Sequence, residues 1–126
     1  KAKLKVILCI GETLKEKKTG KTKSVLSKQI KFGLDKVNKK SNLFIAYEPV
    51  WSIGTGKIPK IKELKDSIKF IKSRFKLKIP KILYGGSVNP KNINNLKVIK
   101  DLDGFLIGGA SQNSKNFIDI VKKTYN

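Results

Sequence analysis

One carboxylate stands at the end of an apolar run, and its surroundings suit proton transfer. Glu48 follows residues 42–47, "NLFIAY", which the near-continuous apolar pattern predicts to be a strand buried on both faces. Pro49 fixes its own backbone angle, whereas Gly54 and Gly56 permit angles that other residues avoid. Such a segment could close over Glu48 as a lid. Because an enclosed carboxylate becomes more basic, Glu48 is a candidate general base; a helix-capping or salt-bridged glutamate is the alternative.

Three glycine-containing loops follow predicted strands and offer backbone N–H groups with little side chain around them. They contain Gly54 and Gly56, then Gly85, Gly86 and Ser87, and finally Gly108 and Gly109. Exposed N–H groups beside the start of a helix bind anions, and a phosphate fits such a site. Any one of these glycines could simply make a strand-to-helix turn. Three such loops converging beside one carboxylate favour a phosphate site.

Four strand-then-helix units must position these residues. We expect strands at residues 5–10, 43–47, 81–86 and 103–109. The helices that follow carry apolar stripes at helical spacing: Leu26, Ile30, Leu34 and Val37; Ile61, Leu64, Ile68, Ile71 and Phe75; Ile93, Leu96 and Ile99; Phe117, Ile118, Val121 and Tyr125. Asn89 is expected to cap the third helix, and the fourth is expected to be capped near Ser114.

Apolar strands that alternate with amphipathic helices predict an α/β fold with a parallel sheet and right-handed crossovers. The carboxyl edge of that sheet then collects all of the loops named above, and sites of α/β folds form at that edge. Periodicity alone also allows a doubly wound sheet.

The strong basic charge does not identify a partner. The chain has 29 Lys and Arg against 9 Asp and Glu, a net charge of +20, but Arg74 is the only arginine. Base-reading and bidentate phosphate contacts favour arginine, and the lysines are spread along the whole chain. We therefore expect no specific nucleic-acid binding, only weak adhesion that salt abolishes. No apolar run approaches the roughly 20 residues that span a bilayer, so no membrane association is expected.

Cys9 is the only cysteine, and the chain contains no histidine. We therefore expect no metal site and no other cofactor, and we interpret Cys9 as a small buried core residue. A single cysteine excludes an internal disulfide and fits a reducing, cytoplasmic setting. The chain opens with Lys-Ala-Lys and contains no methionine, so we expect that Lys1 is not the natural start.

Four motifs together resemble the triosephosphate isomerase family: "CIGETLKEKKTG", "AYEPVWSIGTGK", "ILYGGSVNP" and "DGFLIGGAS". They occur in the order and spacing of that family, and they match the second half of its chain, from about the fifth barrel strand. The resemblance implies one domain over residues 1–126, a half-barrel of four βα units of the TIM-barrel type. It also implies the interconversion of glyceraldehyde 3-phosphate and dihydroxyacetone phosphate through an enediolate, a reaction of glycolysis and gluconeogenesis.

The resemblance assigns roles to individual residues. Glu48 matches the catalytic base, and residues 49–59 match the lid, which includes Pro49, Val50, Trp51 and Gly56. The phosphate grip is matched by the N–H groups of Gly54, Ser87, Gly108 and Gly109. Hydrogen bonds that change as the lid moves involve Tyr47, Trp51 and Glu12. From the residues alone, Glu12 is expected to be structural and to accept a hydrogen bond from Trp51 or from a backbone N–H. The residues that latch the lid closed are Tyr84 and Ser87.

The sequence departs from the family in ways that bear on activity. The family's lysine and histidine belong to the half that this chain does not match, so the chain alone is expected to be inactive or nearly so. Pro59 stands where the family often has alanine, and the latch tyrosine bonds to the N–H of that residue. Because proline has no N–H, we expect that Tyr84 cannot make this latch. Ser52 also stands where alanine is usual.

Four βα units would leave two open sheet edges and strand faces without packing partners. Two copies related by a two-fold axis could close both edges, so a homodimer is favoured; the missing N-terminal half of the barrel is the other candidate partner. The alternative to an isomerase fragment is a noncatalytic phosphate-binding or structural half-barrel that assembles with itself.

Overall fold

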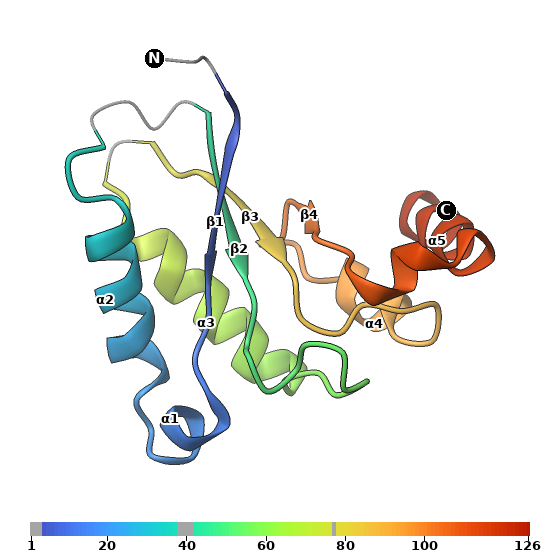
Figure 1. Ribbon diagram of the computed structural model, residues 1–126, viewed down its shortest axis with the longest axis horizontal. Helices are drawn as coiled ribbons and strands as arrows, with labels where there is room; N and C mark the ends of the chain where they lie inside the picture. The colour runs from blue at the N-terminus through green and yellow to red at the C-terminus, as the bar shows by residue number, and fades with distance from the viewer. Residues whose placement is uncertain (1–3, 38–41, 77) are drawn as a thin grey trace.

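Four parallel strands form one open sheet in the order β1-β2-β3-β4 (Figure 1). The computed structural model describes residues 4–37, 42–76 and 78–126. The strands are β1 (Val6–Ile10), β2 (Leu43–Tyr47), β3 (Lys81–Tyr84) and β4 (Gly104–Phe105). The predicted α/β class is confirmed, and because each strand pairs with the next in chain order, the sheet is half of a TIM-type barrel and not a doubly wound sheet.

Helices follow each strand of the sheet. They are α1 (Leu14–Lys18), α2 (Thr22–Gly33), α3 (Ile61–Ser73), α4 (Ile93–Lys97), the 3₁₀ helix η1 (Gly109–Gln112) and α5 (Ser114–Tyr125). Helices α2 and α3 lie beside β1 and β2, whereas α4 and α5 pack together near β4 (Figure 1). Helix α1 was not predicted, although Thr13 and Glu16 form a capping box, which is a sequence signal for the start of a helix.

The core lies between the sheet and its helices, and β2 is its centre. Four of the five β2 residues are buried, as the sequence predicts for this strand. The predicted stripe of α3 is buried at Leu64, Ile68 and Ile71, and Phe75 is buried just beyond the end of the helix. The other buried apolar residues from the predicted stripes are Leu26, Ile30, Ile93, Leu96 and Ile99. The last residue of the first stripe, Val37, lies beyond α2 and is exposed.

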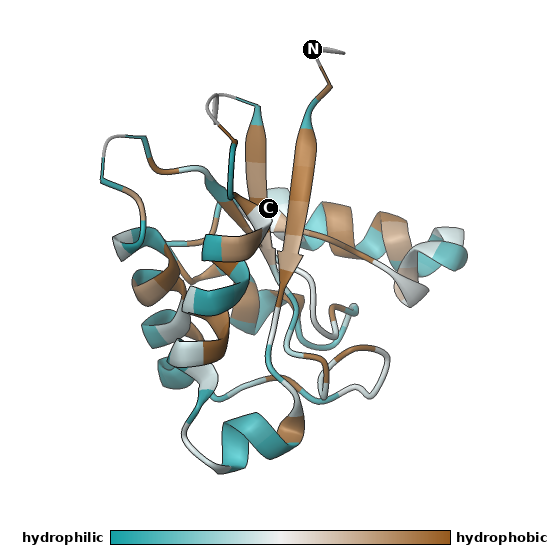
Figure 2. Cartoon of the chain, turned by 60° about the vertical axis from the view of Figure 1, so that its left-hand side comes forward, coloured by the Kyte–Doolittle hydropathy of each residue, from teal (hydrophilic) through white to brown (hydrophobic). Residues whose placement is uncertain are grey.

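Strand β1 is not buried on both faces, contrary to the prediction. Val6 is 52% exposed and Ile7 is 45% exposed, and only Ile10 is buried. Cys9 is exposed, so its interpretation as a core residue is wrong. The physical reason is that β1 is an edge strand, and the described residues provide nothing to cover it. Figure 2 shows the resulting apolar strand surface that no helix covers.

The last unit also differs from its prediction. Strand β4 has two residues instead of the seven at 103–109, and Asn113, not Ser114, caps α5 by accepting from the Asn116 N–H. The predicted apolar stripe of α5 is exposed, with Phe117 40% and Tyr125 85% exposed, and Ile120 is the one buried residue of that helix. Its apolar face therefore has no partner among the described residues.

The third unit is shorter than predicted. Strand β3 ends at Tyr84, and α4 begins at Ile93, so Asn89 does not cap the helix itself. Its side chain instead accepts hydrogen bonds from the N–H groups of Lys91 and Asn92, in the turn before the helix. This turn fixes the path of the chain between the end of β3 and α4.

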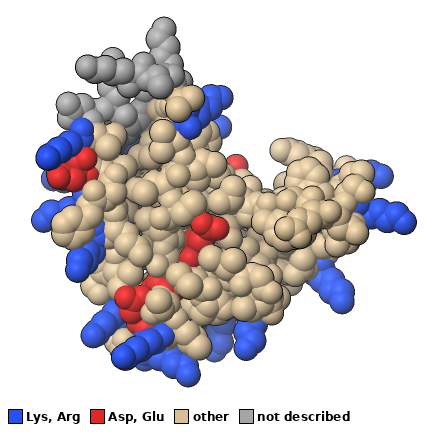
Figure 3. Space-filling model, viewed as in Figure 1, with Lys and Arg blue, Asp and Glu red and all other residues tan. Residues whose placement is uncertain are grey.

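On the face that Figure 3 shows, the lysines form no single patch. In Figure 3 they lie around the rim, while the middle of the visible face is mostly uncharged. Within residues 4–37, 42–76 and 78–126, no helix is long and apolar enough to cross a membrane.

Candidate active site

Glu48 lies directly after β2, between the ends of β1 and β3. Its backbone N–H donates to the Ile10 carbonyl at 2.7 Å, which continues the parallel pairing of β1 with β2. A Cβ on Gly11 would lie 1.8 Å from the Glu48 carbonyl oxygen, and one on Gly85 would lie 2.8 Å from Oε1 of Glu48. Both neighbouring strands therefore need glycine where they pass this residue. The half-buried carboxylate is held in a slot that larger residues would fill.

Cys9 is a neighbour of Glu48 that was not predicted. Partial burial, a hydrogen bond to Glu48 and the charge of that carboxylate together raise the pKa of the Cys9 thiol to about 11. Strand register could have revealed this contact. Cys9 pairs with Ala46, and Ala46 and Glu48 are two residues apart and so share a face.

Glu12 is a buried carboxylate that binds the start of the lid. Its Oε1 accepts from Trp51 Nε1 at 3.0 Å, which is the predicted hydrogen bond, and its Oε2 accepts from Tyr47 Oη at 3.1 Å. The Glu12 carbonyl accepts from the Val50 N–H at 3.0 Å. Burial and the Glu12 charge hold the pKa of Tyr47 well above its usual range, so this phenol stays a donor.

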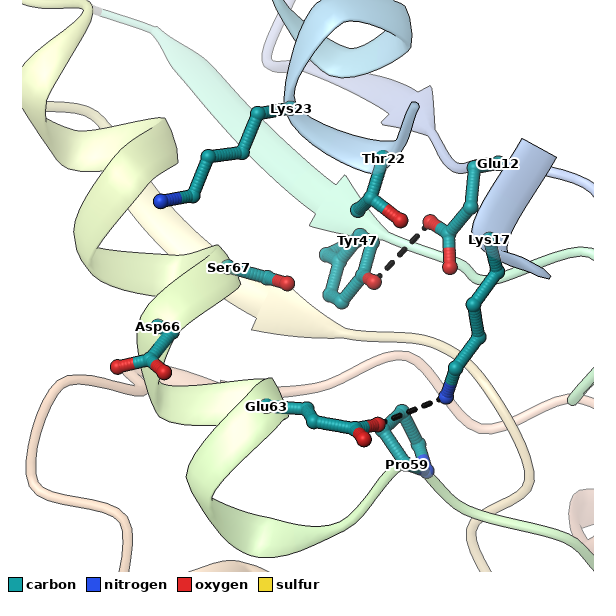
Figure 4. A pocket seen from close by; sticks show the side chains of 9 residues that line it. All are labelled: Glu12, Lys17, Thr22, Lys23, Tyr47, Pro59, Glu63, Asp66 and Ser67. Carbon is teal, nitrogen blue, oxygen red and sulfur yellow. Dashed lines mark hydrogen bonds and ion pairs between the residues drawn. The ribbon is translucent and has the colours of Figure 1, made fainter. Parts of the chain in front are cut away.

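A cavity of about 280 Å³ lies between α1, the start of α2 and α3, next to these groups (Figure 4). Glu12 and Tyr47 line its inner end, and Pro59 at the end of the lid lines another side. Lys17 binds Glu63 at 2.7 Å, and its ammonium also lies 4.1 Å from the centre of the Trp51 ring. Glu48 does not line this cavity, so the cavity is separate from the candidate base.

Gly54 and Gly56 give the lid its shape. Their φ angles are +69° and +76°, which side-chain-bearing residues rarely adopt. A Cβ at either position would meet no atom within 4 Å, so the requirement is conformational and not one of space. Residues 53–57 are all exposed, whereas Pro49, Ser52 and Pro59 are buried. The tip of the lid is therefore free and its two ends and Ser52 are anchored.

Tyr84, at the end of β3, contacts the lid through Ser52. The two hydroxyl oxygens are 3.0 Å apart, and the Ser87 N–H donates to the same Ser52 oxygen at 3.1 Å. Gly108 and Gly109 follow β4, the neighbour of β3, and both are exposed. The loops that carry the predicted phosphate-binding N–H groups therefore share the carboxyl edge of the sheet.

Comparison with known proteins agrees with this geometry. The family model described as "Triosephosphate isomerase" matches residues 1–124. The triosephosphate isomerase of Thermodesulfovibrio yellowstonii is 44% identical over 125 residues, which are 94% of this chain and 51% of that protein. Those of Mycoplasma mobile and Leptospira interrogans are 45% and 44% identical, covering 92% and 91% of this chain and 48% and 50% of theirs.

The chain belongs to the triosephosphate isomerase family. It spans about half the length of the curated relatives that it matches. The match runs through all four motifs that the sequence singled out, from Cys9 to Ser111.

The contacts of Ser52 were not predicted from the sequence, because a serine hydroxyl in a loop can turn toward many partners. Its only signal was an alcohol at a position where the family usually has alanine.

Proposed function

We propose that this chain is the part of a triosephosphate isomerase that carries the base, the lid and the phosphate grip. Its substrate is then a phosphorylated triose, and its reaction belongs to glycolysis and gluconeogenesis in the cytoplasm. The observation that carries the proposal is the slot around Glu48. At the carboxyl edge of the sheet, Gly11 leaves room for the backbone of Glu48 and Gly85 leaves room for its carboxylate, beside a loop that Glu12 anchors, in a member of this family.

The proposed reaction is a proton transfer between neighbouring carbons. The Glu48 carboxylate removes a proton from the carbon next to the substrate carbonyl, and the electrons of the broken C–H bond form the enediolate. Delivery of a proton from the carboxyl group to the former carbonyl carbon, together with transfer of the hydroxyl proton to the former carbonyl oxygen, completes an isomerisation with no net oxidation or reduction. The reaction as written needs no external oxidant or reductant.

The loops around Glu48 have two proposed tasks. The N–H groups of Gly54, Gly108 and Gly109 hold the phosphate. The Ser87 N–H, which was predicted for the same task, donates to the Ser52 hydroxyl at 3.1 Å instead. The lid excludes water and keeps the enediolate from losing that phosphate. The anchoring of Trp51 and Val50 to Glu12 supports this assignment, because a lid needs one fixed end to close over the same place each time.

The chain alone is proposed to be inactive or nearly so. Its sequence has no histidine, so the usual neutral imidazole that would polarise the substrate carbonyl is missing. Losing one preorganised donor of this kind typically costs about 10²–10³ in rate. The exposed apolar residues of β1 and α5 support the proposal that a partner covers them, either a second copy of the chain or an N-terminal half-barrel.

The exposed faces of β1 and α5 also favour a second candidate, a noncatalytic half-barrel that binds phosphate and assembles with itself. A coupled assay with glyceraldehyde 3-phosphate separates the two proposals. In the complete protein to which this chain belongs, Glu48→Gln should lower kcat by about 10²–10⁴. Asp119→Asn, which changes a carboxylate of α5 paired with Lys123, is the matched control and should retain the rate. Equal rates in the parent protein and Glu48→Gln would favour the noncatalytic candidate.

A further inference from the structure

Ser52 is completely buried, although the next five residues of the lid, 53–57, are all exposed. Its hydroxyl contacts three groups at once: the carbonyl of Lys57 within the lid, the hydroxyl of Tyr84 at the end of β3, and the N–H of Ser87 in the turn that follows. Two of these three contacts join the lid to a separate strand and turn.

The hydrogen count fixes the direction of each bond. A serine hydroxyl has one hydrogen and can accept two more. The Lys57 carbonyl can only accept, so it takes the Ser52 hydrogen. The Ser87 N–H and the Tyr84 hydroxyl must then both donate to Ser52. Burial raises the pKa of Tyr84 to about 12, so its hydrogen is available at any ordinary pH. The Ser52 hydroxyl is therefore saturated, with its one hydrogen and both acceptor positions in use.

The turn after β3 is shaped around this hydroxyl pair. A Cβ on Gly86 would lie 2.3 Å from the Tyr84 hydroxyl oxygen and 2.7 Å from that of Ser52. Glycine at this position leaves the space that the two hydroxyl groups occupy. The contact therefore depends on three residues from two segments, which is more than an incidental surface hydrogen bond requires.

We propose that Ser52 is a positioning residue that latches the lid to the end of β3, through Tyr84 and Ser87. This inference rests on the proposed function for its effect on the reaction. Pro59 has no N–H to offer Tyr84, and the Ser52 hydroxyl accepts the tyrosine hydrogen in its place. The latch holds the exposed tip of the lid, Ile53 to Lys57, beside the turn that contains Ser87.

The direct test replaces Ser52 by alanine in the complete protein and follows the Ser87 amide by hydrogen exchange. Loss of its acceptor should speed exchange at that amide by about tenfold, the size expected for a lost hydrogen bond. Trp51 is the only tryptophan of this chain, and its fluorescence should shift as the lid loosens. If the complete protein carries another tryptophan, that residue is replaced by phenylalanine first.

The matched control is Thr55→Val, which also removes a lid hydroxyl. Thr55 bonds only to groups of the lid itself, the carbonyls of Trp51 and Ser52 and the N–H of Lys57. This variant should leave Ser87 exchange near that of the parent, because no hydrogen bond of the Thr55 hydroxyl involves Ser87. Ser52→Ala should lower kcat by about tenfold with little change in KM, because the latch acts on the closed lid more than on the first encounter with substrate.

Tyr84→Phe tests the same contact from the other side and keeps the proposal testable if Ser52→Ala does not fold. Tyr84→Phe should loosen the lid tip as Ser52→Ala does. Combining the two substitutions should loosen it little more than either one alone. Unchanged Ser87 exchange and Trp51 fluorescence in Ser52→Ala would overturn the latch. Because these two readouts need no turnover, an inactive parent protein would contradict the proposed reaction and leave the test of the latch intact.

Discussion

Gly11 and Gly85 lie next to Glu48, and a side chain at either position would occupy the space of Glu48 atoms. At Gly85 the conflict is with the side chain, since an added Cβ would lie 2.6 Å from Glu48 Cγ. At Gly11 it is with the backbone, at 1.8 Å from the Glu48 carbonyl oxygen. A methyl group at Gly85 therefore moves the carboxylate, whereas one at Gly11 separates the strands.

Gly85→Ala should lower kcat/KM by about a hundredfold while the protein remains folded, because a shift of about 1 Å in a reacting group has that effect. The control is Gly104→Ala, where the added Cβ would lie 3.2 Å from the flexible end of the Leu83 side chain. Steady-state kinetics and circular dichroism measure both variants. A fully active Gly85→Ala protein would show that the glycine does not set the position of Glu48.

Cys9 reports on the charge of Glu48. Because its pKa is raised to about 11, the reactive thiolate is scarce at pH 8, and alkylation by iodoacetamide should accelerate as the pH rises toward 11. Glu48→Gln removes the negative charge, so the midpoint of the rate profile should move to lower pH. Identical profiles for the two proteins would mean that the thiol and the carboxylate are not neighbours in solution.

At the scale of the elements, the lid is held at one end by Glu12 and near its tip by Ser52. Glu12 accepts from two donors, Trp51 Nε1 and Tyr47 Oη, and only a carboxylate can face both of them with acceptor atoms. A glutamine at this position would turn its NH₂ group toward one of the donors.

Glu12→Gln should therefore destabilise the protein by about 1–3 kcal/mol, the usual effect of leaving a buried polar group without its partner. Urea unfolding followed by Trp51 fluorescence measures this change at the lid itself. Asp119→Asn breaks an exposed ion pair on α5 and should cost less than about 1 kcal/mol. Equal stability of the two variants would contradict the role given to Glu12.

The sequence predicted some elements well because their packing partners belong to the same chain. The apolar stripe of α3 and the apolar run of β2 are both buried within this chain, so the apolar pattern alone was sufficient to predict their burial. The same reasoning was wrong for β1 and α5. An apolar pattern predicts that a face will be covered, but it does not say whether the cover comes from this chain.

The candidate site divides in a similar way. The position of Glu48 directly after β2 could be predicted from the apolar run before it. The bond from Trp51 to Glu12 could be predicted from the residue types and the motif resemblance. The contacts of Ser52 with Tyr84 and Ser87 could not, since they depend on the exact path of two turns. The contact of Cys9 with Glu48 needed the strand register as well as the sequence.

At the scale of the whole molecule, the uncovered apolar edge and the net charge of +20 oppose each other. Burial of the β1 edge favours association, whereas repulsion between two strongly basic chains disfavours it. Salt screens that repulsion over about 8 Å at physiological ionic strength. Association of the 126-residue chain should therefore strengthen as salt is added.

Light scattering at increasing salt should show a mass above that of one chain. Ile7→Lys places a charge on the exposed face of β1 and should return the mass to one chain. Val98→Lys, at an exposed position beyond α4, is the control and should not change the mass. A one-chain mass at every salt concentration would contradict self-association and leave an N-terminal half as the proposed partner.

The central claim is that Glu48 transfers a proton between two carbons of a phosphorylated triose. Isomerisation in D₂O, followed by NMR of the product, tests this most directly, because a carboxylate base exchanges its proton with solvent before returning it. The complete protein should incorporate deuterium at the carbon that receives the proton, and Glu48→Gln should slow this incorporation by about 10²–10⁴. Incorporation at the same rate in Glu48→Gln would contradict the account.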